Sequence, residues 1–555
     1  METKQLKFLK FSPHITLLKS LNLVNKTRAK FQLPVNYPIQ IVFIFVFFIG
    51  IPHYTSAQYT TPDSISENVD FIKNQHRSAK EYILDLFNRY NIVIFGERIH
   101  DELTQYYLLK DLFSDPRFYN QVGNIFMEIG GSNFDGMINR YLLSSGLTPS
   151  QSNEKALEIQ RNSSWYPSWV NYNYHYLLTS LYGINKDLPS DKKLKLHPTD
   201  IAIDWQQIKT REDVIKKILA PEIQDGRDSV MASNILAFVR ENSKQKDTRK
   251  KYFVILNLPH AANGVYNIQG IATKSAASYI IENYPITTAN VLINSQNNKG
   301  IISTTIMSPE TVPILDGKMD AAFEYTGIDD LGFDINNSPL QGRVFEDLPM
   351  NDTNTTYEKV FTGYLFYKAF PAHELVVGVP GLVDEKFLPE LKRRYSLFGW
   401  PQNDEQLFQL NTIMNKRPDG LVSFWQKVSY WAGGGKTVSG FYNQSKSIDE
   451  TLKFILDEKA KGSNTIFNVS EMGLNVFGYS LSSQGKDEDA LKIFELNTRL
   501  YPNAANTYDS YGEILLKLNR TQEALKAYKK ALELNPKNMN ASQIINQLEK
   551  QLNNK

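Results

Sequence analysis

The chain has 555 residues, and 61 lysines and arginines nearly balance 59 acidic residues, which gives a net charge of +2. At roughly 100 to 200 residues per domain, this length predicts two or three folded units. The charge pattern carries no general nucleic-acid signature. Cysteine is absent, which excludes disulfides, thiolate metal sites, a cysteine nucleophile and a lipidated cysteine.

An apolar segment at residues 41–51 predicts export. It follows three basic residues and precedes Thr55-Ser56-Ala57, which is the layout of a signal peptide. About eleven apolar residues are fewer than the roughly 20 that span a bilayer. We therefore expect residues 1–57 to be a signal peptide cleaved after Ala57, and the protein to be periplasmic or extracellular. Because some forty residues precede the apolar run, an uncleaved membrane anchor and a start codon assigned too early stay open as alternatives.

Residues 58–377 alternate between strand-like and helix-like patterns. Helical spacing predicts helices at 79–90 and 101–113, and apolar runs predict strands at 92–95, 122–128, 194–203, 252–258, 290–294 and 363–370. Strands that alternate with helices favour parallel pairing. The sequence therefore predicts an α/β domain with a mainly parallel sheet flanked by helices.

The C-terminal part is predicted to be helical, with a connecting region at 378–465 and a repeat region at 466–555. Four positions recur after 34 residues: Gly478, Ala490, Phe494 and Pro502 return as Gly512, Ala524, Tyr528 and Pro536. This period is typical of two tetratricopeptide repeats. Two repeats rarely bury a stable core alone, so we expect them to stack on the helices before residue 465. They favour binding of a protein partner, and a scaffold or capping role is the alternative.

Ionisable residues follow three of the predicted strands. Glu97 and His100 lie in the turn Gly96-Glu97-Arg98-Ile99-His100, Glu128 ends the second strand, and His260 follows the strand at 252–258. Because the carboxyl ends of parallel strands line the ligand crevice of such a sheet, these groups are expected to meet there. This arrangement predicts an active site.

The turn offers a base and a group to orient it. His100 precedes a predicted helix, whose dipole favours the neutral imidazole that a general base needs. Glu97 would orient the ring and stabilise the imidazolium. A helix cap with a surface histidine is the alternative, and a zinc site is disfavoured because the second histidine of the helical zinc motif is missing.

Glu128 and His260 extend the predicted site. Glu128 precedes Gly130-Gly131, and its expected burial favours a second acid or base with a raised pKa, or a metal ligand, over a structural partner for an arginine. His260 has small neighbours that leave it accessible as a second acid or base. A core histidine is the alternative.

Further polar and aromatic residues are weaker candidates. Arg227, Met231 and Asn234 share one face of a helix behind Pro221, and taken alone this spacing favours an ordinary amphipathic helix. A buried Arg227 would suit an oxyanion or hold two acids together. His197 and Asp200 end another strand. The aromatic segment from Trp165 to Tyr176 reads as helix core, with part of it over the pocket.

In order and context, these residues resemble the erythromycin esterase family over approximately residues 85–375. The most specific elements are Gly96-Glu97-x-x-His100 and Arg227-Asp228-x-x-Met231-Ala232-x-Asn234; Trp165 and the phrase His197-Pro198-Thr199-Asp200 also fit. The resemblance implies an α/β fold and hydrolysis of a macrocyclic lactone ester without a required metal or cofactor.

Position by position, the resemblance implies that His100 activates water with support from Glu97 and Glu128. It further implies that His260 and Arg227 assist the oxyanion and that Trp165, His197 and Asp200 contact the substrate. One departure is His260-Ala261-Ala262-Asn263, where the family shows His-Asn-x-His.

The sequence therefore predicts an exported hydrolase of a small-molecule ester or lactone, with no cofactor, metal or nucleic-acid partner. Two alternatives stay open. One is a protein of the same superfamily that binds haem, a metal or a small ligand, and the other is a non-catalytic scaffold that uses its repeats.

Overall fold

The computed structural model describes residues 63–553 apart from 165, 168, 170, 247, 269–270, 299–310, 417–437, 463–464, 466 and 537. The chain divides into two compact units at residue 58, and the description below concerns the second unit. The predicted leader, residues 1–57, lies outside the described residues. Within the described ranges, no helix combines the length and apolar character needed to cross a membrane.

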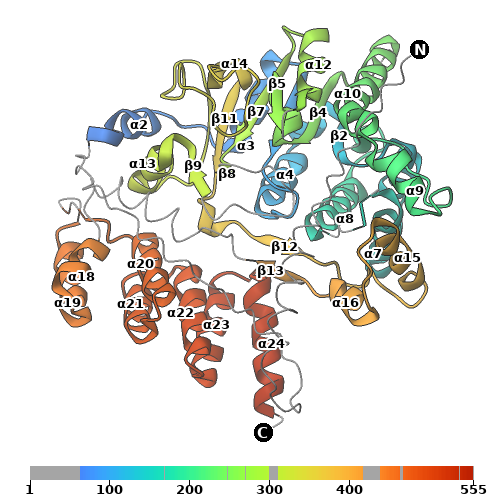
Figure 1. Ribbon diagram of the computed structural model, residues 1–555. Coiled ribbons are helices and arrows are strands. Elements are labelled where there is room, and N and C mark those ends of the chain that lie inside the picture. The colour runs from blue at the N-terminus through green and yellow to red at the C-terminus, as the bar shows by residue number, and fades with distance from the viewer. Residues whose placement is uncertain are drawn as a thin grey trace, which may run out of the picture. The chain divides into compact units, whose positions relative to one another are not determined.

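A seven-stranded sheet confirms the predicted α/β fold class (Figure 1). The strands run in the order β10-β11-β7-β1-β4-β2-β3, and every pairing among them is parallel except that of β10 with β11. Their bounds are β1 Ile92–Glu97, β2 Val122–Gly131, β3 Lys195–Asp200, β4 Lys251–Asn257, β7 Thr288–Ile293, β10 Asp330–Asp334 and β11 Gly363–Tyr367. The six strands predicted from apolar runs are therefore all present.

Helices cover both faces of the sheet, which is why its strands read as continuous apolar runs. In β1, Ile92 and Ile94 belong to one core and Val93 and Phe95 to the other. The first core also takes side chains from α2 (Asp63–Lys73), α10 (Pro221–Lys244), α12 (Ala276–Asn283) and α13 (Lys318–Thr326). The second takes them from α3 (Ala79–Arg89), α4 (Thr104–Ser114), α6 (Asp135–Leu142), α7 (Pro149–Ser163) and α8 (Tyr172–Asp187).

The edge strand β10 escaped prediction. It is only five residues long, carries an aspartate at each end and is interrupted by Gly332. That glycine packs against Tyr82, whose Cβ would lie 2.4 Å from any added side-chain carbon. A short strand with one glycine and polar ends lacks the apolar run on which prediction depends.

The connecting region is mainly helical as predicted, with α15 (Leu388–Phe398), α16 (Asp404–Phe408), α18 (Val438–Ser445) and α19 (Ile448–Ala460). Its strand β13 (Met414–Lys416) pairs antiparallel with β12 (Leu375–Val377), which ends just before this region begins, and the sequence predicted neither strand. The glycine cluster at 433–435 lies outside the described residues.

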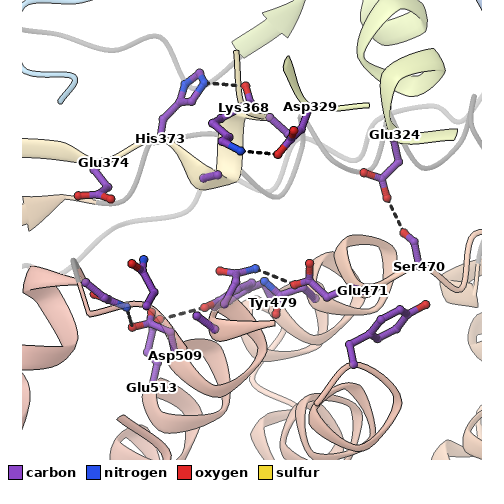
Figure 2. A pocket seen from close by; sticks show the side chains of 18 of the residues that line it. Glu324, Asp329, Lys368, His373, Glu374, Ser470, Glu471, Tyr479, Asp509 and Glu513 are labelled. Carbon is purple, nitrogen blue, oxygen red and sulfur yellow. Dashed lines mark hydrogen bonds and ion pairs between the residues drawn. The ribbon is translucent and has the colours of Figure 1, made fainter. Parts of the chain in front are cut away.

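The repeat region forms α20 (Glu471–Ser483), α21 (Asp487–Leu500), α22 (Ala505–Lys517), α23 (Thr521–Leu534) and α24 (Met539–Asn553). The 34-residue period reflects close helix crossings, because a Cβ on Gly478 or Gly512 would lie 2.6 Å or 2.9 Å from the ring of Phe494 or Tyr528. Residues of α18 and α19 share the apolar core of α20–α24, which is the predicted stacking. A cavity of about 930 Å³ lies beside α20 and α22 (Figure 2).

Candidate active site

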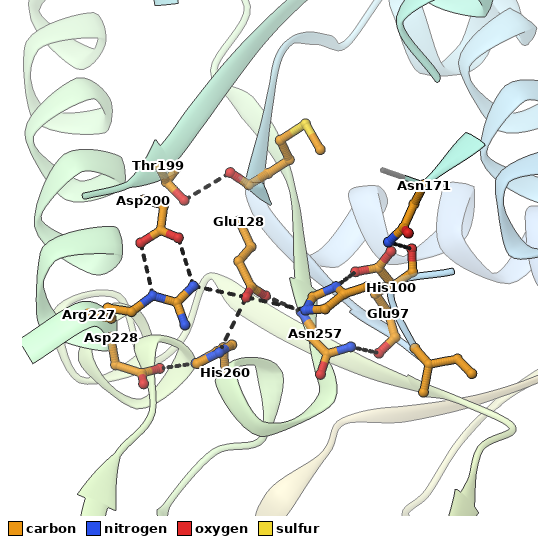
Figure 3. Close-up of polar contacts among 12 residues, drawn as sticks. Glu97, His100, Glu128, Asn171, Thr199, Asp200, Arg227, Asp228, Asn257 and His260 are labelled. Atoms are coloured by element: carbon orange, nitrogen blue, oxygen red, sulfur yellow. Dashed lines mark hydrogen bonds and ion pairs between the residues drawn. The ribbon is translucent and has the colours of Figure 1, made fainter. Parts of the chain in front are cut away.

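The predicted acids and bases come together at the carboxyl ends of strands β1, β2 and β4, beside helix α10 (Figure 3). Glu97 is the last residue of β1, Glu128 lies near the end of β2, and His260 lies in the short helix α11 (Leu258–Ala261) that follows β4. Gly130 takes a left-handed backbone conformation with φ 109°, which favours glycine where the chain turns after Glu128. The register of the parallel strands thus places residues far apart in sequence at one edge.

Glu128 is the centre of the cluster and is 2% exposed. Its Oε1 lies 3.2 Å from Arg227 Nη2, 3.4 Å from His260 Nε2 and 3.7 Å from His100 Nε2. Its Oε2 accepts a hydrogen bond of 2.9 Å from the backbone N–H of Asn257. Burial favours the neutral acid, but the positive charges of His260, His100 and Arg227 outweigh it and lower the pKa of Glu128 to about 2.

This pKa is opposite to the raised value expected from the sequence. The expectation considered burial alone, whereas the structure surrounds the carboxylate with three cationic or titratable groups. Glu128 is therefore ionised at neutral pH. It acts as a fixed negative charge and not as a proton donor.

His100 is held by two polar neighbours on one side of its ring. Its Nδ1 lies 3.1 Å from Glu97 Oε2 and 2.9 Å from the Tyr174 hydroxyl, and the Tyr106 hydroxyl donates to Glu97 Oε1 at 2.6 Å. The Asn171 side chain donates to the His100 backbone carbonyl at 3.0 Å. These contacts fix the ring so that Nε2 faces Glu128.

The expected neutral state of His100 is not what its surroundings favour. Helix α4 begins at Thr104. His100 therefore lies outside the first turn of the helix, and the helix dipole acts within that turn. Burial lowers the pKa of His100, but the negative charges of Glu128 and Glu97 outweigh it, and the pKa is raised overall. Neutral imidazole thus forms at a higher pH than for a free histidine.

His260 is paired with Asp228, a residue for which the sequence predicted no role. Its Nδ1 lies 2.8 Å from Asp228 Oδ1, and Asp228 also accepts hydrogen bonds from the Tyr266 hydroxyl at 3.0 Å and the Ala276 N–H at 2.7 Å. Burial lowers the pKa of His260, but Asp228 and Glu128 outweigh it and raise the pKa to about 9. His260 therefore carries a proton on both nitrogens at neutral pH.

Arg227 forms a bidentate ion pair with Asp200. Its Nε and Nη2 donate to the two carboxylate oxygens at 3.0 Å and 2.7 Å, and Asp200 is fully buried. The same Nη2 also donates to Glu128. Arg227 therefore holds Asp200 and Glu128 together, which is one of the two roles predicted for it from the sequence. Asp200 positions the guanidinium from behind.

Other predicted residues lie elsewhere. His197 is outside the cluster, because one ring nitrogen bonds Asp135 and the other lies 3.0 Å from Asn124 Oδ1, and its ring packs on Phe126 and Phe238. Trp165 lies outside the described residues. From the same aromatic segment, the Trp169 ring centroid lies 5.1 Å from that of His100.

Tyr106, Asp228 and Asn257 were missed as site residues, and Tyr174 was expected only as part of the aromatic segment over the pocket. Asp228 directly follows Arg227 in the motif Arg227-Asp228-x-x-Met231. That position, together with a histidine at a strand end that needs an acidic partner, was the one signal in the sequence for a role of Asp228. The tyrosines lie on α4 and α8, where helical spacing alone does not show which turn meets the sheet edge.

The cluster can stabilise negative charge and accept a proton. Arg227 and protonated His260 provide N–H donors around Glu128, and His100 provides an imidazole whose Nδ1 is already oriented. Among the described residues, no group of three or more His, Asp or Glu side chains has the geometry to hold a metal ion.

Comparison with known families supports one of the predicted repeats. Residues 512–538 match the family model of the tetratricopeptide repeat, and no match was found among curated proteins. Similar solved structures include an erythromycin esterase mutant in its open conformation, at 12% identity and a TM-score of 0.34, with 55% of this chain and 96% of that chain covered.

Two other similar structures were found. A Bacillus cereus protein matches at 13% identity and a TM-score of 0.33 over 55% of this chain and 96% of its own. The first tetratricopeptide domain of Spaghetti, bound to an HSP90 peptide, matches at 20% identity and a TM-score of 0.16 over 21% of this chain and 86% of its own.

Proposed function

We propose that this protein hydrolyses an ester or lactone of a small molecule with water activated by His100. The observation that carries the proposal is the orientation of His100, whose Nδ1 is held by Glu97 and Tyr174 while its Nε2 faces Glu128. A base, an orienting carboxylate and cationic donors then lie within one buried cluster. A general base and donors for an oxyanion are groups that accelerate acyl transfer to water.

The proposed reaction begins with neutral His100. Its Nδ1–H donates to Glu97, which leaves the Nε2 lone pair to take a proton from water as the water oxygen attacks the carbonyl carbon. The carbonyl oxygen becomes an oxyanion that the Nε2–H of His260 and the guanidinium of Arg227 stabilise. The tetrahedral intermediate then expels the alkoxide, which takes the proton back from His100 Nε2.

The acidic residues have supporting roles in this proposal. Glu128 keeps the two imidazoles and Arg227 from repelling one another, and Asp228 keeps His260 protonated and oriented. Asp200 does the same for Arg227. These three residues are positioning residues, since each acts through the base or the donors.

The test is hydrolysis of a panel of esters and lactones, macrocyclic lactones included, by the purified protein and by His100→Ala. His76→Ala is the matched control, because His76 is exposed and lies outside the cluster. We expect turnover in the wild type and the control, loss in His100→Ala, and no effect of a chelator. No turnover by any of the proteins, or turnover abolished by the chelator, would contradict the proposal and favour a binding role or a metal-dependent reaction.

Two further parts of the proposal concern location and partners. We propose export, on the basis of the apolar segment at 41–51, and cell fractionation with sequencing of the mature N-terminus tests it. We also propose that the repeat region binds a protein partner, since tetratricopeptide repeats generally mediate such contacts.

A further inference from the structure

Between β1 and α4, side chains from other elements bond the backbone of four successive residues: Glu97, Arg98, Ile99 and His100 (Figure 3). Asn257 donates to the carbonyls of the first two, at 3.3 Å and 2.9 Å, and Asn171 donates to the carbonyl of the fourth at 3.0 Å. Gln105 accepts from the N–H of the second at 2.9 Å and donates to the carbonyl of the third at 3.2 Å. The turn that carries His100 is therefore bonded along its whole length.

The side chain of Arg98 extends from this turn towards β7 and β11, and the residue is 6% exposed. Its Nε donates to the backbone carbonyl of Asn294 at 2.7 Å, and its Nη2 donates to the side-chain oxygen of Asn294 and to the carbonyl of Tyr367. Asn294 directly follows β7, and Tyr367 is the last residue of β11. One guanidinium thus ties the turn to the carboxyl ends of two strands that supply none of the acids and bases in the cluster.

Arg98 is also tied to helix α4 through Glu102. Its Nη1 donates to Glu102 Oε2 at 2.8 Å, and the carboxylate oxygens accept from the N–H groups of Thr104 and Gln105, at 2.7 Å and 3.1 Å, where α4 begins. The two side chains of the pair are 4% and 1% exposed. A buried ion pair adds little stability over apolar side chains of similar size, because desolvation offsets its attraction. The stability of the fold is therefore a weak explanation for this pair.

We propose that Arg98 is a positioning residue, which holds His100 against Glu97 and Glu128 by tying the turn to β7, β11 and α4. An error of about 1 Å in the position of a reacting group can slow a reaction about 100-fold, so this tie is expected to set kcat and not KM. Lysine cannot replace it, because a single ammonium lacks the planar fork of donors. The inference rests on the proposed role of His100 as the base, but the state of the ring can be measured without turnover.

The test is the variant Arg98→Lys, which keeps the charge and loses the fork. We expect kcat for the best ester to fall by about tenfold or more while KM stays within about twofold. The NMR titration of the His100 ring is the second measurement, because Glu97, Glu128, Tyr174 and His260 face that ring and the two carboxylates raise its pKa. A loosened turn should let His100 lose its proton at a lower pH. His260, held by Asp228, should keep its titration and is an internal control.

Arg249→Lys is the matched control for a loss of stability alone. Arg249 also binds backbone carbonyls with its guanidinium, but beside the amino ends of β2 and β3, opposite the cluster; the carbonyls are those of Tyr119, Val122, Lys192 and Lys193. This variant should melt at a lower temperature and leave kcat and the His100 titration unchanged. Equal losses of kcat in the two lysine variants, measured well below their melting temperatures, would overturn the proposal. Unchanged kcat and an unchanged His100 titration in Arg98→Lys would do the same.

The double variant Arg98→Met/Glu102→Gln decides the question if Arg98→Lys does not fold. It removes both members of the pair and so leaves no unpaired buried charge, and we expect the same fall in kcat at unchanged KM. If the wild type hydrolyses no ester, the His100 titration decides alone. A lower titration in the Arg98 variants then supports the positioning role, and an unchanged titration overturns it, whatever becomes of the proposed hydrolysis.

Discussion

Replacing Glu128 by glutamine removes the central charge of the cluster with almost no change in shape. In the wild type, Glu128 Oε1 lies 3.4 Å from His260 Nε2 and 3.7 Å from His100 Nε2, and its charge helps to raise the pKa of both. Without that charge, both imidazoles should lose their protons at lower pH. The pKa of His260, about 9 in the wild type, should move towards its ordinary range.

The size of the effect follows from the distance. With an effective dielectric constant of 20, Coulomb's law gives about 5 kcal/mol for unit charges at this separation, which is an upper bound. A fall of the His260 pKa by one to two units corresponds to about 1.4 to 2.7 kcal/mol, well inside that bound. Asp228 remains as a partner in the variant, so the pKa is not expected to fall further.

The assay is the NMR titration of the histidine ring nitrogens in the wild type and Glu128→Gln. Glu390→Gln is the control, because it removes a carboxylate that pairs with Arg393 and Arg394 in α15. The control should leave the His260 titration in place. A His260 titration that is the same in Glu128→Gln and the wild type would refute the reasoning about the cluster.

Three further predictions concern stability and the remaining candidates. The pKa of His260 in the folded state is raised from 6.5 to about 9, so its contribution to the free energy of unfolding is fully present below about pH 6.5 and is lost as the pH rises through 9. The pKa of Glu128 in the folded state is lowered from 4.5 to about 2, so its contribution is fully present above about pH 4.5 and is lost as the pH falls through 2. Denaturant unfolding across pH checks both limits, and a flat profile would contradict them. Gly512→Ala should destabilise the repeats by about 1 to 3 kcal/mol because the added Cβ would lie 2.9 Å from Tyr528, whereas Gly183→Ala in α8, with no atom within 4 Å, should be neutral or stabilising in the same melts. His197→Gln should lower stability but leave KM unchanged, since both ring nitrogens bond within the protein; a raised KM at unchanged stability would restore His197 as a substrate contact.

The sequence predicted those members of the cluster that lie at the ends of strands. Glu97, His100, Glu128 and His260 each follow a buried apolar run, and parallel pairing of β1, β2 and β4 is sufficient to bring them to one edge. The 34-residue repeat was equally readable, because each glycine and aromatic pair makes a helix crossing that tolerates no larger residue.

The protonation states were beyond prediction from the sequence. Burial alone predicts a raised pKa for Glu128, and a helix dipole alone predicts a neutral His100. The structure reverses both, because Arg227 and the two imidazoles surround the Glu128 carboxylate. Glu97 and Glu128 in turn lie beside His100 and raise its pKa. The side chains of Arg227 and Asp228 reach the cluster only because of the way α10 packs against the sheet. Helical spacing shows which residues share a face of α10, but it does not show which acid or base that face contacts.

The most direct test of the proposed hydrolysis is kcat against pH for the best ester substrate, measured with the wild type and His100→Gln. Because the pKa of His100 is raised and neutral His100 is the proposed base, wild-type kcat should increase with pH above about 6.5 as the ring loses its proton. His100→Gln should be at least about 100-fold slower and lack this rise. A variant that keeps kcat within tenfold of the wild type, or the same rise with pH, would contradict the role of His100 as the base.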